Sequence, residues 1–293
     1  MNETQACAVV GTSAWKKEAW RKSFYPPDLP DTRELRYLAE RMPTVEVNST
    51  WHSLQPSSSF RSWRDQVPER FVFSVKVWRG ITHDRPLRGA EQEIAVFLAS
   101  GPLLLGAKLG PLLWQFPETF GFDVDVLDGF LTALPRSVDE ARQFIDRNGG
   151  RVDSELAAIP DRPLRHALEV RNAGFRQSRY LELLRRHGIA AVATNSTRWP
   201  VIDAVTAGFV YVRFDDGLAR FPHGQSEEQL TQHAARIQNW LAEDLDVYFY
   251  FDDPDSSKGH KGSDRPPFDA ITLQRLVGGE QPAPGTTLQT TLW

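Results

Sequence analysis

Eight short apolar segments recur along this chain, most of them separated by stretches with helical periodicity. The segments lie at residues 7–13, 44–48, 71–77, 112–116, 166–171, 189–194, 208–214 and 247–252. Strands that alternate with helices are joined as parallel strands by right-handed crossovers, and eight such units are what a closed barrel requires. The pattern therefore predicts an α/β fold, a single (β/α)₈ TIM-like barrel.

The main alternative is an open, doubly wound parallel sheet. Such a sheet normally carries a glycine-rich phosphate loop after its first strand. Here the first strand is followed by Gly11-Thr12-Ser13-Ala14-Trp15, which matches neither the dinucleotide-binding pattern nor the P-loop. The missing loop favours the barrel.

The length of the chain suits one domain of this kind, since barrels of about 250 residues are common. We expect the barrel to occupy residues 1–276 of the 293, with an extra helical segment near 136–162 that Asn148-Gly149-Gly150 interrupts. Helices are expected at 31–40, 58–67, 94–99, 124–131, 180–187 and 226–242. Residues 277–293, which contain Pro and Gly, are expected to form a C-terminal tail.

Charge and cysteine content restrict the partners and the compartment. The formal net charge of -4 argues against non-specific binding to nucleic acid or to an anionic membrane surface. Cys7 is the one cysteine, so an intrachain disulfide and a cysteine-based zinc site are excluded, and a reducing compartment is expected. Because residues 1–5 lack signal-peptide character and no apolar run approaches a membrane span, we expect a cytoplasmic protein without a membrane partner.

The second strand carries the first candidate site residues. Residues two apart in a strand point to the same side, so Glu46 and Asn48 share one face while Val45 and Val47 pack on the other. A half-exposed strand would show the same pattern. The functional interpretation depends on whether other strands also end in polar residues.

Most of the predicted strands do end in this way, and in a barrel these ends meet at the C-terminal face, where activity is usual. The strand-end residues are Ser13, Glu46, Asn48, Lys76, Gln115, Glu169, Arg171, Arg213 and Asp252, with Arg79, Thr82, His83 and Asp253 in the loops that follow. Lysine and arginine side chains in such a set favour a small anionic ligand, phosphorylated or sugar-like.

The residue types suggest roles for an enzyme acting on such a molecule. Lys76, Arg171 and Arg213 would hold the anion, and Glu46 or Glu169 would transfer a proton. Asn48, Gln115 and His83 would orient the substrate, with His83 also a candidate catalytic residue. The further candidates for substrate binding are Arg79, Tyr211 and Asp252.

Two alternatives stay open. In the first, Glu46, Glu169 and Asp252 hold a divalent metal ion in a hydrolase or isomerase, or only neutralise the arginines in buried ion pairs. In the second, the protein is a non-catalytic module that binds nucleic acid or another ligand. Its basic and aromatic surface would be formed by Trp15, Lys16, Lys17, Trp20, Arg21 and Lys22.

Several of these segments together resemble the YecE-like family of domain of unknown function 72. The resemblance spans most of residues 8–276 and rests on the segments 11–15, 24–26, 45–50, 73–76, 81–83, 109–117, 167–171, 209–213 and 247–252. It implies a TIM-like barrel and brings with it no established biochemical activity.

Three positions depart from that resemblance. Thr194 stands where similar sequences often carry Asp, Asp215-Asp216 replaces His-Gly, and Ala173-Gly174-Phe175 replaces Pro-Ser-Trp. These changes remove one carboxylate and one imidazole from the expected site. They imply an altered substrate or a lost activity.

Overall fold

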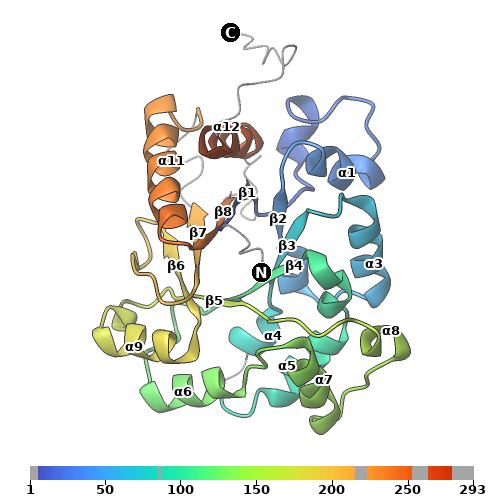
Figure 1. Cartoon of the computed structure of the whole chain (residues 1–293), viewed down its shortest axis with the longest axis vertical. Helices are drawn as coiled ribbons and strands as arrows, with labels where there is room; N and C mark the ends of the chain where they lie inside the picture. Colours follow the sequence, from blue (N-terminus) through green and yellow to red (C-terminus); the bar gives the residue numbers. More distant parts are fainter. Residues whose placement is uncertain (1–5, 85–86, 215–222, 253–262, 279–293) are drawn as a thin grey trace.

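Eight parallel strands close into a barrel in the computed structural model, which describes residues 6–84, 87–214, 223–252 and 263–278 (Figure 1). Each strand pairs with the next in the sequence, and the eighth pairs with the first, so the predicted barrel is confirmed. The strands are β1 Ala8–Thr12, β2 Thr44–Val47, β3 Val72–Lys76, β4 Leu109–Gln115, β5 His166–Glu169, β6 Ala190–Thr194, β7 Phe209–Phe214 and β8 Asp246–Phe251.

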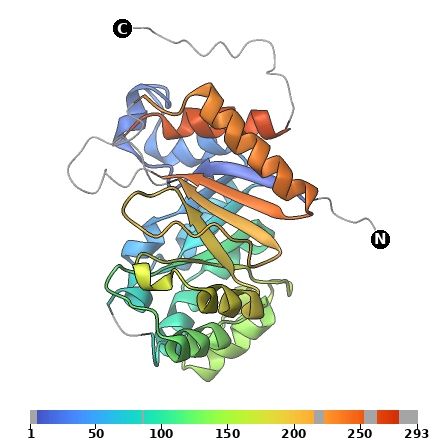
Figure 2. The same ribbon diagram turned by 90° about the vertical axis from the view of Figure 1, so that its left-hand side faces the viewer.

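Helices lie outside the strands, as the two views at right angles show (Figures 1 and 2). The α-helices are α1 Glu34–Ala39, α2 Ser49–His52, α3 Ser57–Gln66, α4 Arg79–Thr82, α5 Glu91–Ala99, α6 Val124–Ala133, α7 Val138–Arg147, α8 Ser154–Ala157, α9 Ser178–His187, α11 Glu227–Ala242 and α12 Pro266–Gly278. Shorter 3₁₀ helices are η1 Glu18–Lys22, η2 Asp31–Arg33, η3 Pro102–Lys108 and η4 Ala173–Phe175. Among the described helices, none is long and apolar enough to cross a membrane.

Two of the predicted boundaries can be compared with these elements. Helices α7 and α8 lie within 136–162, the range in which the sequence predicts added helical structure. Helix α12 continues through Gly278, so Val277 and Gly278 belong to a helix, and Val277 packs against the core. The remainder of the predicted tail lies outside the described residues.

Local sequence explains where several helices begin and end. Ser226 and Gln229 form a reciprocal capping box at the start of α11, which satisfies backbone N–H groups that a helix N-terminus leaves unpaired. Helix α9 ends where Gly188 adopts the left-handed conformation, with φ 62°. The sequence boundary expected at His187-Gly188 is therefore correct.

Alternate residues along a strand pack into two different apolar clusters. On β7, Phe209 and Tyr211 contribute to a cluster inside the barrel, together with residues such as Leu113. Val210 and Val212 belong instead to the larger cluster that includes the surrounding helices. Arg213, two residues after Tyr211, consequently points to the inside of the barrel, at its C-terminal end.

Gly11 allows β1 and β2 to approach closely, because a Cβ atom there would lie 2.1 Å from the Thr44 carbonyl oxygen. We expect Gly11→Ala to lower the free energy of unfolding by about 1–3 kcal/mol, the usual effect of overpacking. Gly129→Ala is the matched control, since a Cβ there meets nothing within 4 Å and α6 gains helix propensity. Urea unfolding of both variants measures the difference, and equal stabilities would contradict the prediction.

Candidate functional site

Arg213 lies at the centre of a buried charged cluster formed by the C-terminal ends of the strands. Its guanidinium group donates to Glu46 Oε1 at 3.0 Å, to Glu169 Oε2 at 2.6 Å and to Asp252 Oδ2 at 2.5 Å. Arg213, Glu46 and Glu169 are at most 1% exposed. Charges this deep in a protein are tolerated only when they are paired and hydrogen-bonded, as these are.

Glu46 and Glu169 differ in their electrostatic surroundings although both bind Arg213. Burial raises the pKa of Glu46 and outweighs Arg213, which lowers it; the Tyr211 hydroxyl also donates to Glu46 Oε2 at 2.6 Å. Burial also raises the pKa of Glu169, but Arg213, Arg171 and Lys76 outweigh it and hold this pKa well below its usual range. At neutral pH, Glu169 is the firmly ionised member of the pair.

Further hydrogen bonds hold Glu169 and Asp252 in place. Gln115 Nε2 and Arg171 Nε both donate to Glu169 Oε1, at 2.7 and 2.9 Å. The Ser13 hydroxyl donates to Asp252, and Asn48 Nδ2 donates to the Ser13 carbonyl oxygen at 2.8 Å. Together with the contacts of Arg213, these hydrogen bonds connect the C-terminal ends of six strands, or the residues that follow them, into one network.

Lys76 lies at the end of β3 and is 8% exposed. Within the described residues, no acceptor forms a hydrogen bond or an ion pair with its Nζ, which lies 4.8 Å from the centroid of the Trp51 ring. Burial and Arg213 lower the pKa of Lys76 to about 8, against the opposing effect of Glu169, Glu46 and Asp252. Lys76 is thus a buried amine held near carboxylates without a direct partner among them.

Aromatic and basic side chains surround Lys76 and Arg171. Trp51 lies 5.2 Å from the His83 ring and 5.1 Å from the Arg79 guanidinium carbon, while Arg171 lies 4.6 Å from the Trp199 ring. Burial and the nearby cations lower the pKa of His83 to about 4, so its imidazole is neutral at neutral pH. Arg79 also pairs with Asp84 at 3.0 Å.

The structure brings most of the predicted site residues together. Hydrogen bonds connect Asn48, Gln115, Glu169, Arg171, Tyr211, Arg213, Asp252 and Glu46 through the network, with Lys76 beside it and Arg79 and His83 near Trp51. The geometry favours a positioning role for Arg213 and Tyr211, because their donors bind carboxylates of the protein. Trp199 was missed by the sequence reasoning, since it lies in the non-helical connection between β6 and β7 that carries no recognisable pattern.

The geometry does not favour a divalent metal ion on Glu46, Glu169 and Asp252. Each of these carboxylates accepts from the Arg213 guanidinium, which occupies the position that a shared cation would need. Among the described residues, no group of three His, Cys, Asp or Glu side chains is arranged to hold a metal ion. The three carboxylates therefore fit an arginine better than a metal.

The basic and aromatic surface considered for nucleic acid has its tryptophans inside the protein. Trp15 and Trp20 are 7% and 1% exposed, and Trp20 Nε1 donates to the Ser263 carbonyl oxygen at 3.0 Å. Arg21 pairs with Asp31 and Glu34. Stacking on bases needs accessible rings, so these contacts favour a packing role for the two tryptophans.

The positions that depart from the family pattern have different surroundings. Thr194 is buried at the end of β6, and its hydroxyl has no hydrogen-bond partner in the described part of the chain. Phe175, at the end of η4, is buried with its ring centroid 5.1 Å from that of Tyr180. Asp215, Asp216 and Asp253 lie outside the described residues.

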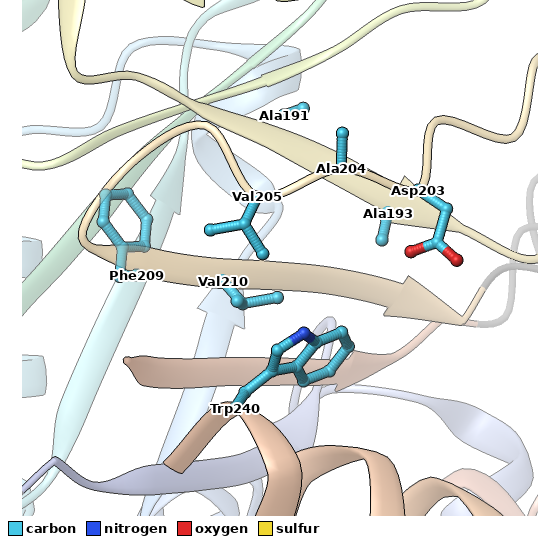
Figure 3. Close-up of a pocket in the computed structure, with 8 residues that line it drawn as sticks. All are labelled: Ala191, Ala193, Asp203, Ala204, Val205, Phe209, Val210 and Trp240. Atoms are coloured by element: carbon cyan, nitrogen blue, oxygen red, sulfur yellow. The ribbon is translucent and has the colours of Figure 1, made fainter. Parts of the chain in front are cut away.

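A small pocket lies elsewhere, between β6, β7 and α11 (Figure 3). Its lining is mainly apolar and consists of Ala191, Ala193, Asp203, Ala204, Val205, Phe209, Val210 and Trp240. Asp203 forms an ion pair with Arg236. The pocket contains none of the polar strand-end residues, so we assign the candidate site to the charged cluster.

Comparison with protein families supports the resemblance seen in the sequence. Residues 9–289 match the model of the family described as "Protein of unknown function DUF72". The chain belongs to the DUF72 family. Solved DUF72 structures share the fold: the Thermotoga maritima protein superposes with a TM-score of 0.65 at 21% identity, covering 93% of this chain and 99% of that one. A DUF72 protein of Enterococcus faecalis gives 0.63 at 18% identity, covering 93% and 98%.

Curated relatives of this DUF72 chain carry names that state no activity. The UPF0759 protein YunF of Bacillus subtilis is 31% identical over 116 residues, which are 38% of this chain and 40% of YunF. The UPF0759 protein YecE of Escherichia coli is 27% identical over 128 residues, 43% of this chain and 44% of YecE. The matched region thus spans less than half the length of these relatives.

Proposed function

We propose that this DUF72 protein is an enzyme that acts on a small anionic molecule, phosphorylated or sugar-like, at the C-terminal end of the barrel. The observation that carries the proposal is the buried cluster around Arg213, with the amine of Lys76 beside it and unpaired among the described residues. A cluster used only for stability would leave no buried amine without a direct partner.

Anion recognition in this proposal rests on three cations. Lys76 is the most buried, while the side chains of Arg171 and Arg79 are 21% and 44% exposed, so a ligand can reach both from solvent. An arginine fork matches the oxygen atoms of a phosphate or carboxylate. Trp51 and Trp199 flank these cations and would contact the apolar part of a sugar-like molecule.

Proton transfer is assigned to Glu46, with Glu169 as the permanently ionised partner. Pairs of titratable groups whose environments separate their pKa values are typical of acid–base sites. The pKa of Glu46 is raised by burial, and that of Glu169 is lowered by its cations. Neutral His83 and Asn48, whose Oδ1 is buried without a partner in the described residues, would orient the substrate.

Turnover of phosphate-ester and sugar-phosphate panels by wild type and Glu46→Gln tests this proposal. The substitution keeps the size and one oxygen that can accept from Arg213 but removes the titrating proton, so we expect kcat to fall at least a hundredfold, the lower end of the usual contribution of acid–base catalysis. Glu40→Gln, at an exposed position, is the matched control and should keep full activity. Equal turnover by Glu46→Gln, or no turnover of any panel member by wild type, would overturn the proposal.

A further inference from the structure

Two of the lysines whose burial the structure describes are buried, and their surroundings differ sharply. Lys108, 6% exposed, donates from Nζ to the carbonyl oxygens of Arg64 and Val67, both at 2.9 Å, and lies 3.5 Å from Glu69. Lys76, 8% exposed, makes no such contact with any described residue. Lys108 therefore has the partners that a structural lysine needs, while Lys76 has an amine available for another use.

The placement of Lys76 matches that of a nucleophile more closely than that of a simple anion ligand. It points inward from the end of β3, since Ser74, two residues earlier, binds the Tyr250 hydroxyl inside the barrel at 2.7 Å. The Trp51 ring covers it on one side. Lysines in water-poor sites beside other cations are the ones that act as covalent nucleophiles.

We propose that Lys76 forms an imine with the carbonyl carbon of a small anionic aldehyde, ketone or 2-oxo acid, a role that rests on the proposed function and names its substrate class. The lone pair of the neutral amine forms the N–C bond, the carbonyl oxygen takes one proton, and the nitrogen gives up one of its two protons. The C–O bond then breaks, and the oxygen leaves as water with a second proton. Nitrogen retains one proton as the protonated imine, so no oxidant or reductant is consumed.

The charges of the cluster suit both the lysine ammonium and the protonated imine. Three carboxylates, Glu46, Glu169 and Asp252, act on Lys76, and Arg213 is bound among them. A protonated imine carries the same single positive charge as the ammonium it replaces, so the carboxylates stabilise product and starting state alike. Glu46 supplies and recovers the protons, and Arg171 binds the anionic group of the substrate.

The fraction of Lys76 that is a neutral amine near pH 7.5 also supports imine formation. A lysine with a pKa of about 8 has roughly two hundredfold more neutral amine at pH 7.5 than an unperturbed lysine. This fraction rises as pH increases toward 8. The rate of imine formation at Lys76 should therefore increase between pH 6 and pH 8, provided that Glu46 keeps its proton-transfer role.

Reductive trapping tests the proposal in the full-length protein. Glyoxylate and glyceraldehyde 3-phosphate, each with sodium cyanoborohydride at pH 7.5, would convert an imine to a stable secondary amine that peptide mass spectrometry locates. We expect at least one of the two probes to label Lys76 at least tenfold faster than Lys108 and exposed Lys16, and inorganic phosphate to slow the labelling. Lys76→Met should lose this label and keep the others; the mapping of wild type decides the question even if this variant does not fold.

The outcomes separate this proposal from the proposed function. If glycerol 3-phosphate or another carbonyl-free phosphate ester is turned over with dependence on Glu46 while neither probe labels Lys76 faster than Lys108, imine formation is overturned and the proposed function stands. If Lys76 is labelled selectively and no panel member is turned over, the imine proposal stands without the phosphate-ester activity. Equal labelling of Lys16, Lys108 and Lys76 also overturns it.

Discussion

Replacing Arg213 with methionine should lower the free energy of unfolding by about 3–5 kcal/mol, the range found when one partner of a buried ion pair is removed. Methionine retains much of the volume but leaves Glu46, Glu169 and Asp252 without the guanidinium that binds them all. Three buried carboxylates would then face each other, so the variant should regain part of its stability as pH falls and they become protonated. Urea unfolding at pH 7 and pH 5 measures both effects.

An exposed arginine provides the control for this experiment. Arg36 lies in α1 and pairs with Glu40 one turn later at 3.5 Å, with its side chain 71% exposed. Because surface ion pairs contribute about 0–1 kcal/mol, Arg36→Met should have little effect. A loss of less than 1 kcal/mol in Arg213→Met would show that the cluster contributes to function without being required for the fold.

Lowering the pH from 7 to 4 should cost wild type about 3 kcal/mol of unfolding free energy through His166 alone, at 1.36 kcal/mol for each unit of pKa difference. His166 is 1% exposed, and burial lowers its pKa from 6.5 to about 4. Trp114 Nε1 donates to its Nδ1 at 3.0 Å, so the proton of the neutral ring is on Nε2, which donates to the Pro135 carbonyl oxygen at 2.8 Å. If Nδ1 took up a proton it would become a donor, and it could no longer accept from Trp114 Nε1.

The sign of this effect follows from proton binding in the two states. Below pH 6.5 the unfolded chain takes up a proton at His166 that the folded protein does not accept until the pH reaches about 4. Stability is therefore full above pH 6.5 and declines as the pH falls to about 4. His166→Asn can still accept from Trp114 and cannot titrate, so urea unfolding of this variant should show a smaller loss over the same range. Identical pH profiles would contradict the assignment.

Much of the barrel could be predicted from periodicity. The short apolar runs at 208–214 and 247–252 identify strands β7 and β8, and the helical periodicity of 226–242 identifies α11 between them. The β4 prediction was too short, because β4 begins at Leu109, where Gly110 and Pro111 interrupt the apolar run. Local signals of this kind arise because strand and helix geometry place side chains at fixed intervals.

Polar strand ends also indicate where the candidate site lies, but not the contacts within it. Polar residues at strand ends, such as Glu46, Lys76, Glu169 and Arg213, could be placed at one end of the barrel because parallel strands share their direction. Spacing along the chain could not show that Arg213 binds three carboxylates, or that Lys76 binds none of them directly.

The sequence by itself determined the eight strands, their order in the barrel and the end of the barrel at which most of them carry polar residues. Only the tertiary structure decided which of those ends meet, that Arg213 is enclosed by Glu46, Glu169 and Asp252, and that Lys76 differs from Lys108. The reason is physical: periodicity depends on neighbours within a segment, whereas pairing and burial depend on side chains as far apart in the chain as Glu46 and Arg213, 167 positions, that meet only when the barrel closes.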